Sequence, residues 1–279
     1  MKKTLILIAL ILNGLSNSFA QHSCCMSSKE VEVAMVSDPS FIAAHMNPLP
    51  LNYAPNNGGM ITFDVPDGKK ANAFYARKEN SKNVIFLFHE WWGLNNYIKR
   101  EAEQLSDMTG ASVFAFDLYD GAVAEKAEDA SKLMEGANEE RIRAIISGGI
   151  DYCGKDSRII TMGWCFGGKW SLQAAMQAGP NTVGCIMYYG FPELDKDKLG
   201  TIKFPVMGFF AKKDEWITPK VVGDFEKLMH DLKKNIVIHN YDAVHAFANP
   251  SNPNYDKVSA DDAMVKSLRF IKMNFENKK

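Results

Sequence analysis

The sequence contains no cluster of basic residues, no internal repeat and no low-complexity tract. Its 32 Lys and Arg nearly balance 33 Asp and Glu, which gives a formal net charge of -1 at pH 7. Nucleic-acid binding is therefore not expected, because neutralising phosphates requires clustered positive charge. Hydrophobic residues make up 46% and charged residues 23% of the chain, which also excludes a disordered or fibrous protein. The 279 residues suffice for one large domain or two small ones.

The sequence also lacks an apolar run long enough to span a bilayer. The apolar stretch at 4–12 is less than half of the about 20 residues that a transmembrane helix needs. Two lysines precede this stretch and the small residues Ser18 and Ala20 follow it, as in a signal peptide cleaved after Ala20. We therefore expect a protein that is exported to the periplasm or secreted, with residues 1–20 removed and no membrane contact thereafter. A retained membrane anchor is the alternative.

Cysteine is scarce, and the chain has five: Cys24, Cys25, Cys153, Cys165 and Cys185. An odd count in an exported protein predicts that at least one thiol stays free. Cys24 and Cys25 are adjacent and precede the predicted folded region. They are candidates for pairing with another chain, for binding a metal or for a thiol redox role. Cys153 and Cys185 have the context of small buried residues.

Residues 21–57 form an extension that precedes the main domain. Asp38-Pro39 is typical of a helix start with proline at the first helical position, and we expect a short helix over 40–45. The prolines and the Asn-Asn-Gly-Gly turn cluster that follow prevent further regular structure. The extension is therefore expected to be an ordered strap on the domain that occupies 58–279.

From residue 58 onward, strand patterns alternate with helix patterns. Apolar runs rich in β-branched and aromatic residues predict strands over 60–65, 71–77, 84–88, 112–116, 158–162, 184–189, 206–210 and 235–241. Helices are expected over 97–108, 124–134, 139–152, 168–177, 220–233 and 258–275. The first two strands flank a Pro-Asp-Gly turn and form a hairpin, whereas the later runs are typical of a parallel sheet buried on both faces. The predicted fold class is α/β, a single α/β-hydrolase domain with a mostly parallel, doubly wound sheet.

The segment 163–168, Gly-Trp-Cys-Phe-Gly-Gly, follows a predicted strand and opens a predicted helix. This is the nucleophile-elbow pattern G-x-Nu-x-G with cysteine at the reactive position. Cys165 is expected in a strained backbone conformation, with glycines two residues away on each side where side chains would clash. Its place at a helix N-terminus favours a thiolate. The alternative is a glycine-rich turn that contains a buried cysteine.

A cysteine nucleophile requires a base and a residue that orients the base. Three histidines follow Cys165, and only His245 lies in a loop after the last strand, where the α/β-hydrolase fold places its base. Asp214 follows the strand at 206–210 and is the expected acid, with the adjacent Glu215 as the alternative. The candidate catalytic residues are therefore Cys165, Asp214 and His245.

A second loop, His-Glu-Trp-Trp-Gly at 89–93, ends the third predicted strand. In this fold that loop supplies one oxyanion-hole N–H and the residue after the nucleophile supplies the other, so Trp91 and Phe166 are the expected backbone donors. Glu90 places a carboxylate in a largely apolar rim, where it needs a partner, and the Cys165 thiol is a candidate. Core packing is the alternative role for the Trp91 side chain.

Together these segments resemble the dienelactone hydrolase family of α/β-hydrolases over roughly residues 58–279. The matching pieces, in family order, are His89-Glu90-Trp91-Trp92-Gly93-Leu94-Asn95, Asp117-Leu118-Tyr119, residues 163–168, Asp214 and residues 245–250. The resemblance implies a triad of Cys165, Asp214 and His245. It also implies that Glu90 interacts with the resting thiol and is displaced when substrate binds. The implied activity is hydrolysis of a carboxylic ester or lactone through a thioester, with no metal or organic cofactor.

Two positions depart from the family pattern. Members that act on dienelactone carry two arginines that hold the substrate carboxylate, and this chain has Gly121 and Asn249 at those positions. Neither can form the bidentate clamp of an arginine, so dienelactone itself is not the expected substrate. The expected partner is a small-molecule ester or lactone, and a monomer is compatible with the sequence. Two other functions stay open, an acyltransferase with the same triad and a non-catalytic small-molecule-binding protein.

Overall fold

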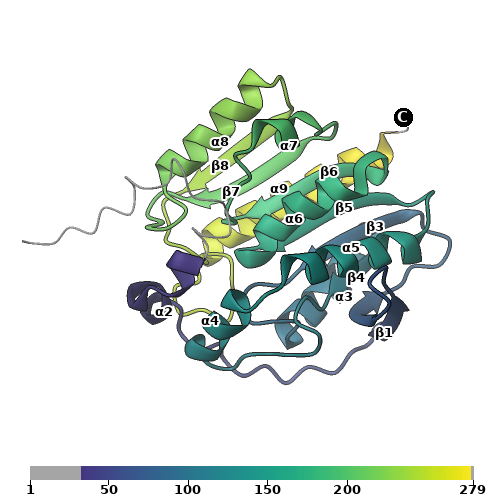
Figure 1. Cartoon of the computed structure of the whole chain (residues 1–279), viewed down its shortest axis with the longest axis horizontal. Helices are drawn as coiled ribbons and strands as arrows, with labels where there is room; N and C mark the ends of the chain where they lie inside the picture. Colours follow the sequence, from purple (N-terminus) through teal and green to yellow (C-terminus); the bar gives the residue numbers. More distant parts are fainter. Residues whose placement is uncertain (1–32, 278–279) are drawn as a thin grey trace, which may run out of the picture.

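An eight-stranded sheet forms the centre of the computed structural model, which describes residues 33–277 (Figure 1). The strands are β1 (Gly58–Asp64), β2 (Lys70–Ala76), β3 (Asn83–Phe88), β4 (Ser112–Phe116), β5 (Arg158–Trp164), β6 (Thr182–Tyr188), β7 (Val206–Ala211) and β8 (Ile236–Tyr241). Their order across the sheet is β1-β2-β4-β3-β5-β6-β7-β8. The β1–β2 and β2–β4 pairs are antiparallel, and the other pairs are parallel.

Helices cover both faces of this sheet (Figure 1). They are α2 (Pro39–Ala44), α3 (Asn96–Thr109), α4 (Ala127–Glu135), α5 (Glu139–Cys153), α6 (Phe166–Ala178), α7 (Lys196–Gly200), α8 (Pro219–Asp231) and α9 (Lys257–Glu276). One face carries α3 and α9, and the other carries α5, α6 and α8. Because side chains alternate along a strand, Phe86 of β3 packs in one apolar core and Ile85 packs in the other. Burial on both faces explains the continuous apolar runs of the sequence.

The predicted α/β class and the mostly parallel sheet are confirmed. The first hairpin pairs Asp64 with Lys70 around the expected turn. Asp38 caps α2 by accepting a hydrogen bond from the Ser40 N–H over 2.8 Å, with proline at the first helical position as predicted. The short helix α7, which Asp195 caps, was not predicted. Five residues are too few to produce a helical period in the sequence.

Residues 33–57 lie along the domain and are held by hydrogen bonds to α3 and α4. On α4, the Ser131 hydroxyl donates to the Val36 carbonyl over 2.7 Å, and α2 lies beside this helix (Figure 1). On α3, one oxygen of Glu103 accepts hydrogen bonds from three successive backbone N–H groups, those of Asn56, Asn57 and Gly58. The Tyr53 hydroxyl donates to the other oxygen of Glu103 over 2.5 Å. The segment that contains α2 is thereby fixed relative to the sheet.

The predicted signal peptide at 1–20 and the adjacent thiols Cys24 and Cys25 lie outside the described residues. Within residues 33–277, none of the helices has the length and apolar character needed to cross a bilayer. Cys153, Cys165 and Cys185 are free cysteines.

Candidate active site

Cys165 lies at the tight bend between β5 and α6, where the elbow pattern predicts it. Its backbone has φ 52° and ψ -116°, a conformation that residues with a side chain rarely adopt. A Cβ at Gly163 would collide with the Gly167 carbonyl, and one at Gly167 would collide with the Phe88 carbonyl. The backbone N–H of Cys165 donates to the Tyr188 carbonyl over 3.0 Å and ties the bend to β6. The glycine spacing therefore holds the thiol at the carboxyl ends of the parallel strands.

His245 lies between the thiol and a carboxylate. Its Nε2 is 3.3 Å from Cys165 Sγ, and its Nδ1 is 2.6 Å from Asp214 Oδ2. The other carboxylate oxygen of Asp214 accepts hydrogen bonds from the backbone N–H groups of Trp216 and Ile217, over 3.0 and 2.9 Å. All three side chains of this group are buried. The structure thus brings together the three residues that the sequence predicted, although they are distant along the chain.

Burial and charge set the protonation of this group. Burial alone would lower the pKa of His245, but Asp214 and Cys165 together outweigh burial and raise that pKa well above its usual range. Burial likewise opposes the charged form of Asp214, yet His245 keeps the pKa of that carboxyl below its ordinary value. Burial raises the pKa of the Cys165 thiol, and His245 offsets only part of the effect. Burial and the charge of Glu90 therefore oppose the thiolate, whereas His245 and the Phe166 N–H favour it. Glu215, the alternative acid, is exposed.

Glu90 is buried, and its two carboxylate oxygens have separate partners. The Tyr189 hydroxyl donates to Oε1 over 3.2 Å, and the Asn249 amide donates to Oε2. Burial raises the pKa of Glu90 to about 7. Within the described residues no hydrogen bond joins Glu90 to Cys165, so the resting carboxylate is held by Tyr189 and Asn249. The thiol still responds to Glu90, because this charge adds to burial in raising the pKa of Cys165.

The two expected oxyanion donors come from neighbouring segments. Phe166 begins α6, and its backbone N–H is hydrogen-bonded to the Cys165 sulfur. Trp91 lies in the loop after β3, and its backbone N–H has no acceptor among residues 33–277. The first residues of that loop contact the start of α6, because a Cβ at Gly167 would also meet the His89 carbonyl. The Trp91 ring is fully buried, so the alternative of core packing applies to its side chain.

The strap brings His45, which no sequence motif marks, next to His245. The centroid of its ring is 5.2 Å from that of His245 and 4.7 Å from that of Trp91. Its Nδ1 donates to the Phe41 carbonyl over 2.7 Å, so its Nε2 carries the lone pair. Burial lowers the pKa of His45 to about 3 and keeps the ring neutral. Nε2 is buried without a hydrogen-bond partner among the described residues, an arrangement that costs about 1–3 kcal/mol.

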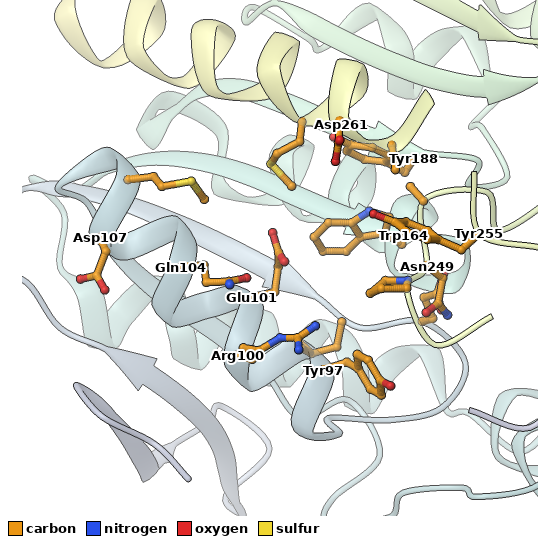
Figure 2. Close-up of a pocket in the computed structure, with 17 residues that line it drawn as sticks. Tyr97, Arg100, Glu101, Gln104, Asp107, Trp164, Tyr188, Asn249, Tyr255 and Asp261 are labelled. Carbon is orange, nitrogen blue, oxygen red and sulfur yellow. The ribbon is translucent and has the colours of Figure 1, made fainter. Parts of the chain in front are cut away.

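A cavity of about 560 Å³ lies between α3 and α9 and adjoins the group of Cys165, His245 and Asp214. Figure 2 shows side chains from both helices and from the strand ends around it, among them Arg100, Glu101, Trp164, Tyr188 and Asp261. Glu90 and Asn249 also line the cavity, whereas Cys165, Asp214 and His245 do not. The hydrogen-bonded pair of Glu90 and Asn249 therefore lies at the edge of the cavity, on the side of the thiol.

In sequence, the chain is similar to known hydrolases. A sequence model of the dienelactone hydrolase family matches residues 71–275. The chain is 29% identical over 227 residues to Protein usf of Aquifex pyrophilus, which covers 77% of this chain and 98% of that protein. It is 25% identical over 209 residues to carboxymethylenebutenolidase 1 of Cupriavidus pinatubonensis, which covers 70% and 87% respectively.

The fold also matches solved structures. A dienelactone hydrolase-like promiscuous phosphotriesterase from metagenomic libraries superposes with a TM-score of 0.68 at 19% sequence identity. The match covers 78% of this chain and 99% of that chain. Carboxyl esterase 2 of Tuber melanosporum superposes with a TM-score of 0.61 at 15% identity, covering 88% and 97% respectively. At these identities the likeness concerns the fold alone.

Proposed function

Because the chain belongs to the dienelactone hydrolase family, we propose that it cleaves a carboxylic ester or lactone with Cys165 as the nucleophile. His245 acts as the base, and Asp214 orients its ring. The observation that carries the proposal is the continuous line of contacts from Asp214 through His245 Nδ1 and Nε2 to Cys165 Sγ, at 2.6 and 3.3 Å. A nucleophile, a base and an orienting acid in this order are the minimum for nucleophilic acyl transfer.

The proton shared by Cys165 Sγ and His245 Nε2 resides on the imidazole when the sulfur attacks as a thiolate. The sulfur forms a bond to the carbonyl carbon, and the electrons of the C=O bond move to its oxygen. When the tetrahedral intermediate collapses, the C–O bond to the alcohol breaks and His245 returns the proton to the leaving oxygen. The product of this half-reaction is a thioester on Cys165. His245 then removes a proton from water, which attacks the thioester, and the acid and the thiol are released.

The backbone N–H groups of Phe166 and Trp91 are the donors that stabilise the oxyanion in both half-reactions. Phe166 is at the first position of α6, where backbone N–H groups have no helical acceptor. A donor aimed at a developing oxyanion is worth about 3–4 kcal/mol. The contact of Gly167 with the loop after β3 keeps the two donor segments adjacent.

Glu90 acts as a restraint on the resting thiol. Its negative charge opposes the thiolate, and its hydrogen bonds to Tyr189 and Asn249 place it at the edge of the cavity. A substrate that enters from the cavity breaks these hydrogen bonds and moves the carboxylate away. This movement opens a path to the thiol and removes the charge that opposes its ionisation. Reactivity is thereby linked to the presence of substrate.

The acyl group of the substrate is proposed to be uncharged. The amide of Asn249 is engaged by Glu90, and the cavity is lined by three further carboxyl groups, those of Glu101, Asp107 and Asp261, against the single guanidinium of Arg100. Gly121, at the other family arginine position, has open space around it. No guanidinium therefore stands at either clamp position to pair with a substrate carboxylate.

The test compares Cys165→Ala and Cys165→Ser with a matched control, Cys153→Ser, on a panel of aryl esters and lactones. Loss of the nucleophile is expected to lower kcat by more than about 10³-fold, while the control retains activity. Intact mass spectrometry of the wild-type protein with a slow ester should detect an acyl adduct that Cys165→Ala lacks. Undiminished turnover by Cys165→Ala would refute the proposal.

A further inference from the structure

The strap places a second imidazole near the thiol, and the proposed hydrolysis does not use it. His45, Cys165 and His245 each offer one ligand atom, and these three atoms lie within 4.8 Å of one another. We propose that His45, Cys165 and His245 form a binding site for a thiophilic divalent cation, with Zn²⁺ as the first candidate. The ion occupies the thiol and so blocks hydrolysis. This consequence rests on the proposed function, whereas the binding itself does not.

Both imidazoles are held in the tautomer that binds a metal through Nε2. His245 directs Nδ1 to Asp214 over 2.6 Å, and His45 directs Nδ1 to the Phe41 carbonyl over 2.7 Å. A carboxylate or a carbonyl behind Nδ1 is the usual support of a histidine ligand, because it fixes the ring and makes Nε2 more basic. The Nε2 atom of His45 is buried and has no other partner among the described residues. A buried acceptor of this kind is available to bind a cation.

The separations suit a four-coordinate ion after a small adjustment. Zn–S bonds of about 2.3 Å and Zn–N bonds of about 2.0–2.1 Å at tetrahedral angles put sulfur and nitrogen about 3.5 Å apart. The His245 Nε2 to Cys165 Sγ distance is 3.3 Å, which already fits. His45 follows the end of α2 in an extended conformation, so its ring can approach by the remaining distance of up to about 1.3 Å.

The chemistry of the ligands favours zinc or a similar soft cation. One thiolate and two imidazoles are a ligand set that selects such ions over magnesium or calcium. Binding releases the thiol proton to solvent and forms a metal–sulfur bond, with no change of oxidation state. The carboxylates of Asp214 and Glu90 act electrostatically on His245 and Cys165, and they offset the charge of the cation. A fourth position remains for water.

The role of the strap follows from this assignment. Cys165 and His245 belong to the α/β domain, whereas His45 comes from the segment before β1. Two ligands alone would bind an ion weakly, so the strap supplies the contact that makes the site selective. An enzyme with this site is inactive while zinc is abundant and recovers when zinc is removed.

The experiment measures binding without reference to turnover. The full chain with Cys24→Ser and Cys25→Ser serves as the parent, because those thiols are a separate candidate for metal binding. After chelator treatment the parent is titrated with Co²⁺, whose thiolate complex has a charge-transfer band in the near ultraviolet, and with Zn²⁺ by calorimetry. One ion per chain is expected, together with a band that disappears in Cys165→Ser.

The informative variant is His45→Phe, which retains a ring against Trp91 and Trp216 and removes the ligand atom. Zn²⁺ affinity should fall by more than about tenfold, since losing even an indirect partner of a ligand costs about 10–100-fold. His230→Phe, at an exposed histidine on α8, is the matched control and should bind as the parent does. If His45→Phe does not fold, His45→Asn offers the same comparison, because its amide can replace the donor to the Phe41 carbonyl.

Equal affinity in the parent and in His45→Phe would show that Cys165 and His245 bind the ion alone, and it would overturn the proposal. The absence of stoichiometric binding would do the same.

A separate assay of ester hydrolysis should show inhibition of the parent by Zn²⁺, with more than about tenfold more Zn²⁺ needed for His45→Phe. If the parent binds Zn²⁺ but hydrolyses no ester even when it is free of metal, the proposed function is refuted and the metal site stands. An undiminished rate of ester hydrolysis at saturating Zn²⁺ would refute the proposed inhibition by the bound ion.

Discussion

Glu90→Gln replaces a buried carboxylate with a neutral group of nearly the same shape. Burial raises the pKa of Glu90 from 4.5 to about 7. Between these values the folded protein binds more protons than the unfolded chain, so this group lowers stability as the pH rises. The pKa of Glu90 thus differs by about 2.5 units between the folded and the unfolded chain, and each unit corresponds to about 1.4 kcal/mol. Ionised Glu90 therefore lowers the free energy of unfolding by about 3 kcal/mol, and the full loss is reached above pH 7. The variant does not bear this cost.

Urea unfolding at about pH 4 and about pH 8 measures the effect. Relative to the wild type, Glu90→Gln should gain about 3 kcal/mol between the lower and the higher pH. The hydrogen bonds that glutamine makes to Tyr189 and Asn249 are the same at both values, so they cancel in this difference. Glu215→Gln, at an exposed carboxylate near the site, should follow the wild type. If Glu90→Gln shows the pH dependence of the wild type, the assignment of Glu90 as a buried, desolvated carboxyl is refuted.

The same variant tests the influence of Glu90 on the thiol. Removing a negative charge near Cys165 favours the thiolate and lowers the pKa of the thiol. The acidic limb of kcat/KM against pH should therefore move to lower pH in Glu90→Gln. An acidic limb at the wild-type position would contradict the proposed restraint on the resting thiol, even if the stability result agreed.

Three further substitutions and one mass measurement test other parts of the chain. Asp214→Asn removes the negative acceptor behind His245 and should lower kcat by about 10⁴-fold in the ester assay, so wild-type rates would exclude an orienting role. Gly167→Ala drives a Cβ into the Phe88 and His89 carbonyls and should cost at least about 1–3 kcal/mol of unfolding free energy in urea, or prevent folding. Glu103→Ala removes the acceptor that holds residues 56–58, and limited proteolysis should then cut the strap faster than in the wild type. For the predicted signal peptide, mass spectrometry of the protein isolated from cells should give a chain that begins at Gln21, and a retained segment 1–20 would refute the predicted cleavage.

The fold and the residues of the contacts Asp214–His245 and His245–Cys165 could be predicted because sequence patterns mark them. Buried parallel strands need continuous apolar runs, and these runs appear in β3 to β7. The elbow needs glycines at positions 163 and 167, since any side chain there meets backbone. The chain order of nucleophile, acid and base then leaves one suitable loop for the acid and one for His245. The first two constraints act on residues that are neighbours in the sequence, and the third is a rule of chain order in the α/β-hydrolase fold.

Contacts between distant segments could not be predicted in the same way. His45 has no motif, and its place next to His245 depends on how the strap folds over the domain. The partners of Glu90 were also out of reach, because Tyr189 and Asn249 are 99 and 159 residues away along the chain. The pKa of Cys165 depends on burial, His245 and Glu90, and only the packed structure shows that all three act on the thiol.

The close approach of Gly167 to the carbonyls of Phe88 and His89 has a consequence for how this scaffold can change. The start of α6 and the end of β3 touch through main-chain atoms, so no side chain sets the spacing between them. Residues that line the cavity from α3 and α9, such as Tyr97 and Met264, can therefore be exchanged while the reacting centre keeps its dimensions. Changes on those two helices alter one part of the cavity wall, while Glu90, Trp164 and Asn249 keep their places in the rest of it.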